Sequence, residues 1–170
     1  MNEAQQVWWT QAKSDLGAFD LLAGNGADRC CVLHYLQMIT EKLSKAYFWS
    51  SNAPPPFSHK GFVQFLRLLG QVRDSDDRKR IAEIFQFARY DDFQTWLRAT
   101  SPLAYEIERL APSVAGSGPN PEYPWPHDSP RFAPATHDFG IWRLITAHRG
   151  RQMLEFIRTA VIRFPEFADL

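Results

Sequence analysis

Apolar residues recur at spacings of three and four along much of the chain, which is the period of a helix face, and the segment 28–49 shows this clearly. Its main stripe consists of Val32, Leu36, Ile39, Leu43 and Ala46. Four further apolar residues widen the expected buried arc, namely Cys31, Tyr35, Met38 and Trp49. A helix that is apolar over most of its circumference lies in the middle of a bundle, so this segment is predicted to be the central helix.

The same period predicts a helix over about 3–23, before the central one. Its stripe consists of Trp9, Ala12, Leu16, Phe19 and Ala23. The turn 24–26 then supplies glycines and an asparagine, which tolerate left-handed backbone at a helix end. So short a turn predicts that the two helices form an antiparallel hairpin.

Shorter helices are expected after the prolines at 54–56, which cannot continue a helix. Ser58 is predicted to cap a third helix, and the acidic run 74–77 to begin a fourth. Their expected buried residues are Phe62, Phe65, Leu66 and Leu69 for the third, and Ile81, Ile84, Phe85 and Ala88 for the fourth. A restart is expected at Asp91-Asp92, and Ser101 and Pro102 are predicted to open a short helix that ends at Leu110.

The composition changes between 111 and 135, where seven prolines exclude a regular helix or a central strand. The segment nevertheless keeps Tyr123, Trp125 and Phe132, which a disordered linker would rarely retain. It is predicted to be an ordered loop that its aromatic rings hold on the bundle. Such long loops are often functional, although a linker draped over a hydrophobic groove would have the same composition.

A final long helix is expected from about 139 to 164, capped by Thr136 or Asp138. Its inner face consists of Met153, Ile157, Ala160 and Phe164. Gly150 interrupts the pattern at a cost of roughly 1 kcal/mol relative to alanine. This glycine either permits another helix to pack closely or divides the helix in two.

These patterns predict an all-α, antiparallel up-and-down helical bundle that forms a single domain over 1–170. Core helices occupy 1–111, the Pro-rich loop 112–135, and the C-terminal helix 136–170. The hydrophobic content of 45% and the charged content of 22% are ordinary for a globular domain.

Net charge and targeting signals narrow the class of protein. The formal charge is zero, from 19 basic and 19 acidic residues, so binding of nucleic acid would require a local patch. Zero net charge also favours self-association, and a homodimer is expected. No signal peptide and no apolar run of the ~20 residues that span a bilayer is present, so a cytoplasmic protein without a membrane partner is expected.

Several short motifs together resemble the HEPN family, small helical bundles often found beside minimal nucleotidyltransferases. An Ala-x-x-Asp step, Ala12 to Asp15, precedes a helix that carries Glu-Lys-x-x-Lys-Ala over 41–46. A proline-bearing loop, a histidine at 59 and a Tyr-Pro pair at 123–124 follow. The resemblance covers roughly 8–124. Glu122 departs from the family pattern, in which an arginine often precedes Tyr-Pro.

The resemblance implies a dimeric bundle associated with nucleotides or RNA. It also implies a nucleotidyltransferase-type partner, as in toxin–antitoxin pairs. Many members of the family are ribonucleases that use an Arg-x4-6-His motif between two subunits, whereas others are partners or binding modules. The leading hypothesis is therefore a nucleotide- or RNA-associated binding or regulatory module. The alternatives are a metal-independent endoribonuclease and a protein-interaction module that uses the Pro-rich loop.

Arg143 and His148 satisfy Arg-x4-His and are the candidate catalytic pair. Histidine would act as general acid or base, and arginine would stabilise the charge on the phosphorus centre. Leu144 stands where family ribonucleases carry a polar residue. Residues five apart on one regular helix also lie about 140° apart, so a dimer or a helix start would have to bring the pair together. The alternative is a solvated basic surface shared with Arg149 and Arg151.

A polar row on the central helix is the candidate ligand-binding site. It consists of His34, Gln37, Glu41 and Lys45, with Cys30 at the same spacing. The row could hold a base or a ribose, or it could be a hydrogen-bonded seam inside the bundle, in which Glu41 and Lys45 form an i,i+4 pair. The seam is the favoured interpretation.

Other reactive residues have simpler interpretations. The pairs His127-Asp128 and His137-Asp138 lack the ligand spacing typical of zinc sites, and neither a metal nor a cofactor is expected. The adjacent Cys30 and Cys31 are expected to be small buried residues and not nucleophiles. The basic run 78–80 is largely offset by the acidic run 74–77, which indicates a solvated charged surface.

Overall fold

The computed structural model describes residues 1–49 and 61–170, and over these ranges it is helical, with no strand. The α-helices of these ranges are α1 (Glu3–Gly24), α2 (Arg29–Phe48), α3 (Phe62–Leu69), α4 (Ser75–Ile84), α5 (Tyr90–Glu108), α6 (Pro112–Ala115), α7 (Ile141–Thr146) and α8 (His148–Ile162). Two short 3-10 turns are η2 (Pro134–Thr136) and η3 (Phe164–Glu166). The predicted all-α bundle is confirmed. No helix of the described part is long and apolar enough to cross a membrane.

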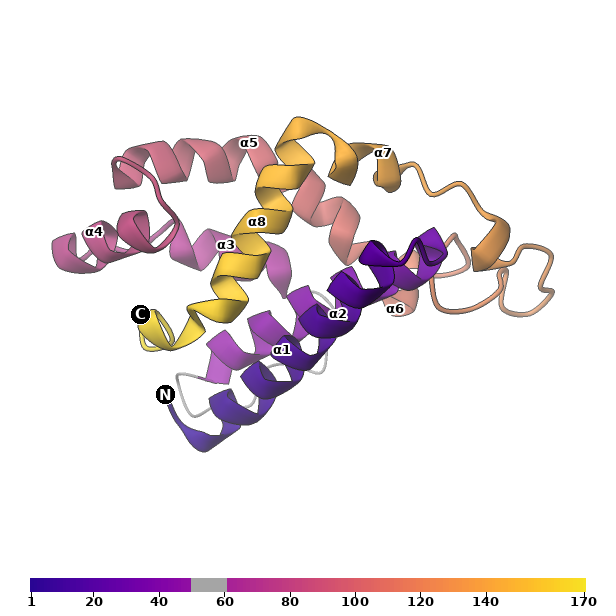
Figure 1. Cartoon of the computed structure of the whole chain (residues 1–170), viewed down its shortest axis with the longest axis horizontal. Coiled ribbons are helices and arrows are strands. Elements are labelled where there is room, and N and C mark those ends of the chain that lie inside the picture. Colours follow the sequence, from indigo (N-terminus) through magenta and orange to yellow (C-terminus); the bar gives the residue numbers. More distant parts are fainter. Residues whose placement is uncertain (50–60) are drawn as a thin grey trace.

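The hairpin of α1 and α2 forms one side of the bundle, and α8 crosses between it and the layer of α3, α4 and α5 (Figure 1). Asn2 and Gln5 form a capping box at the start of α1, each side chain accepting from the other residue's backbone N–H at 2.9 Å. At the turn, Gly26 has φ +66°, which glycine adopts at little steric cost. The predicted hairpin is therefore correct.

Helix α2 lies at the centre of the bundle, as its apolar stripe predicted. All five residues of that stripe are at most 2% exposed. The predicted widening of the arc is wrong at Cys31, which is exposed while Cys30 is buried. The second buried row lies on another side of the helix and consists of Leu33, Thr40, Ser44 and Tyr47. On α1 the stripe stops at Phe19, because Ala23 lies exposed in the last turn.

Aromatic rings from four elements meet in the core. Phe85 lies 4.5 Å from Phe156 and 5.4 Å from Phe93, measured between ring centroids. Phe65 and Phe167 extend the same group. Aromatic pairs at such distances stabilise a core by about 0.5–1.5 kcal/mol beyond area burial.

Two expectations about α4 and α5 are wrong. Helix α4 ends at Ile84, so Ala88 lies outside it and is exposed. Ser101 and Pro102 do not begin a new helix, because α5 continues from Tyr90 through Pro102 to Glu108. The Ser101 hydroxyl donates to the carbonyl of Leu97 at 3.0 Å, and Figure 1 shows α5 bending near its middle. Proline in a helix interior removes one backbone hydrogen bond and typically bends the helix. The predicted cap at Ser58 lies outside the described residues.

The expected final helix is two helices with a sharp corner. Ala147 has ψ 168°, an extended conformation that separates α7 from α8. Gly150 is buried directly beneath this corner, where an added Cβ would lie closer than 3.0 Å to Leu144 O, Ile145 Cα and Ile145 O. Gly150 therefore permits close packing at the corner, whereas the helix itself divides three residues earlier, at Ala147.

The Pro-rich loop is held on the bundle mainly by one ring. Trp125 is 5% exposed and packs on Phe139 and His137. The other two aromatic residues of the prediction, Tyr123 and Phe132, are 54% and 57% exposed. The loop also contains the short helix α6, so it is less irregular than its composition predicted.

Candidate functional site

The predicted polar row on α2 is partly buried and internally bonded. Gln37 and Glu41 are only 3% and 6% exposed. The Glu41 carboxylate accepts a hydrogen bond from Gln37 Nε2 at 3.0 Å and one from Lys45 Nζ at 2.6 Å. Lys45 also lies over the Trp8 ring of α1, 4.8 Å from its centroid. These contacts hold the carboxylate inside the bundle, as the seam interpretation expects.

A second charged pair links α1 to α2 beside this seam. Asp15 Oδ2 lies 3.7 Å from Lys42 Nζ, and the two residues are 6% and 8% exposed. The contact is too long for a hydrogen bond, so its attraction is Coulombic. Gln11 Nε2 donates to the other oxygen of Asp15 at 2.9 Å. The motif residues that resemble the HEPN family thus form two adjacent ion pairs inside the hairpin.

His34 lies apart from the rest of the row. Its Nδ1 is 3.8 Å from a carboxylate oxygen of Glu122, in the Pro-rich loop, and its ring meets the Tyr35 ring edge to face. The row therefore divides between the hairpin interior and the loop. Ligand binding by these residues stays a prediction.

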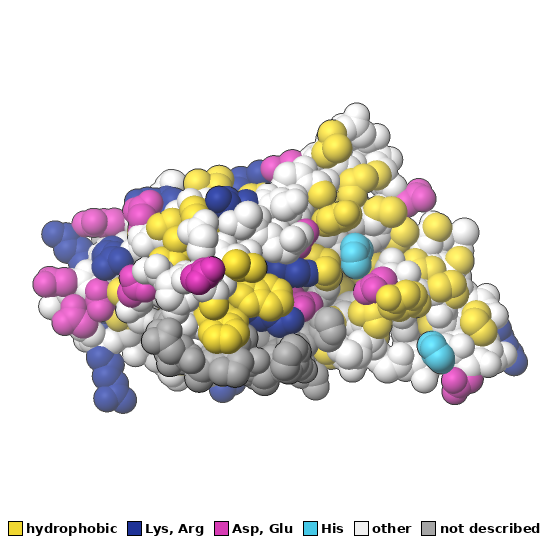
Figure 2. Space-filling model, turned by 90° about the horizontal axis from the view of Figure 1, so that it is seen from below, with side chains coloured by type: hydrophobic (Ala, Val, Ile, Leu, Met, Phe, Trp, Pro, Cys, Tyr) yellow, Lys and Arg dark blue, Asp and Glu magenta, His cyan; other side chains and the backbone are white. Residues whose placement is uncertain are grey.

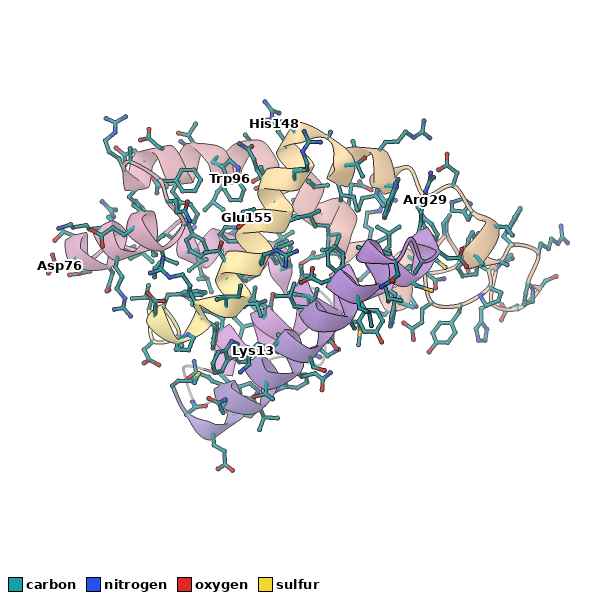
Figure 3. The ribbon with its side chains drawn as sticks, in the orientation of Figure 1. Lys13, Arg29, Asp76, Trp96, His148 and Glu155 are labelled. Atoms are coloured by element: carbon teal, nitrogen blue, oxygen red, sulfur yellow. The ribbon has the colours of Figure 1, made fainter. Side chains whose placement is uncertain are left out.

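The candidate catalytic pair lies on both sides of the corner at Ala147. Arg143 belongs to α7 and His148 is the first residue of α8, and both are exposed. Figure 3 shows His148 at the surface, where α8 begins. The angular separation expected on one unbroken helix therefore does not apply to them. Arg143 Nη2 forms an ion pair with Asp138 at 3.2 Å, so its charge is partly engaged. Catalysis by this pair also stays a prediction.

His127, His137 and the two cysteines have local partners. His127 pairs with its neighbour Asp128 at 3.2 Å on the surface. Within residues 1–49 and 61–170, no three His, Cys, Asp or Glu side chains gather as a metal site would require. Burial, and the nearby Cys31, raise the pKa of the Cys30 thiol, which makes it a poorer nucleophile at neutral pH.

The basic residues of α4 are matched by acids. Arg80 lies 3.8 Å from Asp77, and Lys79 lies 4.0 Å from Glu83. Arg78 donates to the carbonyl of Val72 at 2.7 Å. Figure 2 shows basic and acidic side chains interspersed at this end of the molecule, as the solvated-surface interpretation predicts.

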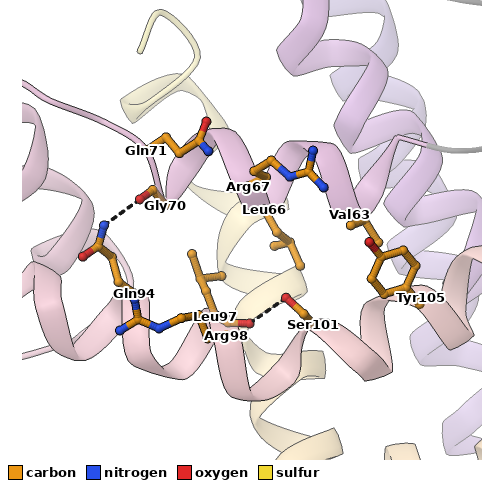
Figure 4. Close-up of a pocket in the computed structure, with 10 residues that line it drawn as sticks. All are labelled: Val63, Leu66, Arg67, Gly70, Gln71, Gln94, Leu97, Arg98, Ser101 and Tyr105. Atoms are coloured by element: carbon orange, nitrogen blue, oxygen red, sulfur yellow. Dashed lines mark hydrogen bonds between the residues drawn. The ribbon is translucent and has the colours of Figure 1, made fainter.

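A groove between α3 and α5 was not predicted from the sequence. Figure 4 shows this α3–α5 groove, whose volume is about 300 Å³. Its lining residues are Val63, Leu66, Arg67, Gly70, Gln71, Gln94, Leu97, Arg98, Ser101 and Tyr105. The floor is apolar, because Leu66 and Leu97 are the buried members of the set.

Two arginines give the α3–α5 groove a positive charge. Arg67 and Arg98 are exposed on opposite walls, and neither has an ion-pair partner within the described ranges. In Figure 4 the Arg67 guanidinium points toward the Tyr105 end, and that of Arg98 toward Gln94. Gln94 Nε2 donates to the carbonyl of Gly70 at 2.7 Å, which ties the two helices together. The groove therefore presents two cationic groups above a fixed apolar floor.

The sequence contains only a weak signal for this groove. The two arginines are far apart along the chain and line the same groove only because α3 packs on α5. Each arginine lies next to a buried leucine in sequence, Leu66 or Leu97, so helical periodicity places it at the edge of an apolar face. That position favours a side chain at a groove rim, but it does not identify the opposite wall.

Comparisons of the chain with models of protein families, with curated proteins and with solved structures find no match. The resemblance to the HEPN family therefore rests on the quoted motifs alone.

Proposed function

We propose that this protein is a nucleotide- or RNA-associated binding module, of HEPN-like type, that holds phosphate groups in the α3–α5 groove. The observation that carries the proposal is the pair of exposed arginines on opposite walls, Arg67 and Arg98, without carboxylate partners in the described ranges. Guanidinium groups recognise phosphate through charge and through paired N–H donors. The proposal requires no global positive charge, because the groove itself is the local patch.

The groove also offers neutral groups for the rest of a ligand. Gln71 and Tyr105 are exposed at its rim, and Leu66 and Leu97 form the floor. A volume of about 300 Å³ lies at the lower end of ligand pockets and suits one nucleotide or a short stretch of single strand. Apolar contact with a base or sugar together with arginine contact to phosphate is a common mode of nucleotide recognition.

A charge-matched double substitution tests this proposal. Arg67→Gln/Arg98→Gln is compared with Lys79→Gln/Arg131→Gln, which removes the same charge from α4 and the Pro-rich loop. Affinity for labelled single-stranded RNA and for nucleoside triphosphates is measured by fluorescence anisotropy and calorimetry at two salt concentrations. The groove variant is expected to lose about tenfold or more in affinity and to show a weaker salt dependence, while the control retains both. Equal affinities of the two variants, or no binding to either ligand class, would contradict the proposal.

The endoribonuclease alternative rests on the corner between α7 and α8. Arg143 and His148 are both exposed there and are not fixed on one straight helix. Structured RNA is incubated with the wild type and with His148→Ala, and His137→Ala serves as a control because that ring packs on Trp125. Loss of cleavage in His148→Ala alone would favour the ribonuclease, whereas equal cleavage by all three proteins would exclude this pair.

The homodimer and the nucleotidyltransferase-type partner belong to the same proposal. Light scattering coupled to size-exclusion chromatography measures the mass at several concentrations. A mass of one chain throughout would remove the dimer from the proposal and leave phosphate binding in the α3–α5 groove untouched. Co-expression with a minimal nucleotidyltransferase from the same genome tests the partner.

A further inference from the structure

A second pocket lies on the other flank of α5, where it faces α8. This aromatic pocket has a volume of about 270 Å³ and is lined by Phe85, Gln86, Phe87, Trp96, Gln152, Glu155, Phe156 and Thr159. Figure 3 shows Trp96 on α5 and Glu155 on α8 close together. The α3–α5 groove shares no lining residue with it, so the two are separate sites.

Four rings form the wall of the aromatic pocket. The Trp96 centroid lies 5.1 Å from that of Phe156 and 5.6 Å from that of Phe87, and Phe85 stacks on Phe156 at 4.5 Å. Phe85 and Phe156 are buried, whereas Phe87 and Trp96 are only partly covered. The partly covered rings leave aromatic surface accessible from the pocket.

The charge of the aromatic pocket is negative. Among the residues that the structure describes, Glu155 is the only charged one that lines it, and no lysine or arginine does so. On the same helix, Arg158 follows Glu155 by three residues. Asp20 engages Arg158 through two contacts of 2.6 and 2.7 Å, and the charge of Glu155 also acts on it. Glu155 is exposed, and no hydrogen bond or ion pair within the described ranges engages its carboxylate. An anionic ligand would be repelled here, and a cation would be attracted.

One rim residue adopts a backbone conformation that its type rarely adopts. Gln86 has φ +60° and follows the end of α4, where the N–H of Phe87 donates to the carbonyl of Ala82 at 2.8 Å. Glycine is the usual residue at such a helix end, because it has no Cβ to clash. Glutamine here places an amide side chain at the rim of the aromatic pocket, beside Gln152 and Thr159.

We propose that the aromatic pocket binds an organic cation, an alkylammonium or guanidinium group, with Trp96 and Phe87 contacting its apolar surface and Glu155 compensating its charge. The faces of aromatic rings attract cations, and the attraction grows when the site is partly desolvated. The pocket is too small for a drug-sized ligand and suits one such group. The cation is either a free small molecule or the end of a lysine or arginine side chain of a partner protein. This binding goes beyond the proposed phosphate site and does not depend on it.

The test uses choline and its neutral isostere 3,3-dimethyl-1-butanol, which has the same shape without the charge. Binding to the full chain is followed by the indole N–H signal of Trp96 in ¹⁵N spectra, assigned with Trp96→Phe. Choline is expected to shift this signal saturably and to bind about tenfold more tightly than the isostere. Glu155→Gln is expected to weaken choline binding several-fold, while Glu83→Gln, an exposed carboxylate of α4 outside the pocket, leaves it unchanged.

Two further measurements distinguish the source of the cation and control for loss of the other site. If a peptide carrying trimethyl-lysine binds at least tenfold more tightly than choline, the cation is the side chain of a partner protein. If the peptide and choline bind with equal affinity, the cation is a free small molecule. Arg67→Gln/Arg98→Gln should leave choline binding intact, so failure of the phosphate site and failure of this one are distinguishable. Equal binding of the neutral isostere, no shift of Trp96 with any cation, or unchanged affinity in Glu155→Gln would overturn the proposal. Thermal melts of both glutamate variants confirm that each is folded.

Discussion

Replacement of Gly150 by alanine is expected to destabilise the fold, against the usual effect of this substitution. Alanine is the better helix former by roughly 1 kcal/mol, and Gly150 lies inside α8. However, its Cβ would lie within 3.0 Å of Leu144 O, Ile145 Cα and Ile145 O. All three atoms are backbone, so no side-chain rotation can relieve the contact, and α7 must move away from α8.

The size of this effect follows from two opposing terms. Overpacking of a core typically costs about 1–3 kcal/mol, and the upper part of this range applies where only backbone can move. After the gain in helix propensity is subtracted, the net loss in the free energy of unfolding is about 2 kcal/mol. For a chain of this size, such a loss lowers Tm by roughly 4–8 °C.

Gly17→Ala is the matched control. Gly17 lies inside α1 and has no heavy atom within 4 Å of an added Cβ. Its substitution should therefore raise the free energy of unfolding by about 0.5–1 kcal/mol. Thermal and urea unfolding followed by circular dichroism measure both variants. If Gly150→Ala is as stable as Gly17→Ala, the backbone of Leu144 and Ile145 does not pack closely on Gly150, and the expected destabilisation is refuted.

Three further predictions concern stability. Gln86→Gly should raise the free energy of unfolding by roughly 0.5–1 kcal/mol in urea melts, because glycine adopts φ +60° without strain; a loss would show that the glutamine side chain stabilises the fold. Glu41→Ala should lower it by about 1–3 kcal/mol, because the buried Gln37 amide loses its acceptor and the partly buried Lys45 loses its 2.6 Å partner; a change below about 0.5 kcal/mol would refute a structural seam. Burial raises the pKa of Tyr47 from 10.0 to about 12. The contribution of its neutral hydroxyl to the free energy of unfolding is therefore fully present below pH 10 and disappears as the pH rises towards 12. In melts from pH 8 to 11.5, Tyr47→Phe should lose stability less steeply than the wild type above pH 10.

Helical periodicity predicted the elements whose signals are local. The hairpin, the central position of α2 and the start of α4 in the acidic run 74–77 followed from spacing, a short turn and an acidic first turn. Pro102 shows where this reasoning stops. Ser101-Pro102 has the local signature of a helix start, yet the apolar residues Leu97, Leu103 and Ile107 continue one buried face through it. Packing of that face keeps α5 continuous despite the missing hydrogen bond.

The candidate sites were harder to predict because they depend on pairs of helices. The seam on α2 could be predicted, since Gln37, Glu41 and Lys45 are one turn apart on a single helix. The partnership of Asp15 with Lys42 requires the packing of α1 on α2. The α3–α5 groove and the aromatic pocket each join helices whose relative placement no local pattern contains.

The Asp15–Lys42 ion pair inside the hairpin has a further consequence, for the alternative arrangements of α1 and α2. An apolar stripe of alanines and leucines could slide by one helical turn, about 5.4 Å, and still bury most of its surface. The Asp15–Lys42 pair could not, because such a slip would separate the two side chains and leave both charges buried without partners. Uncompensated buried charges cost several kcal/mol, even where the native pair itself adds little stability. The Asp15–Lys42 pair therefore acts chiefly by penalising misaligned hairpins, and it selects one register from several that the apolar residues alone would accept.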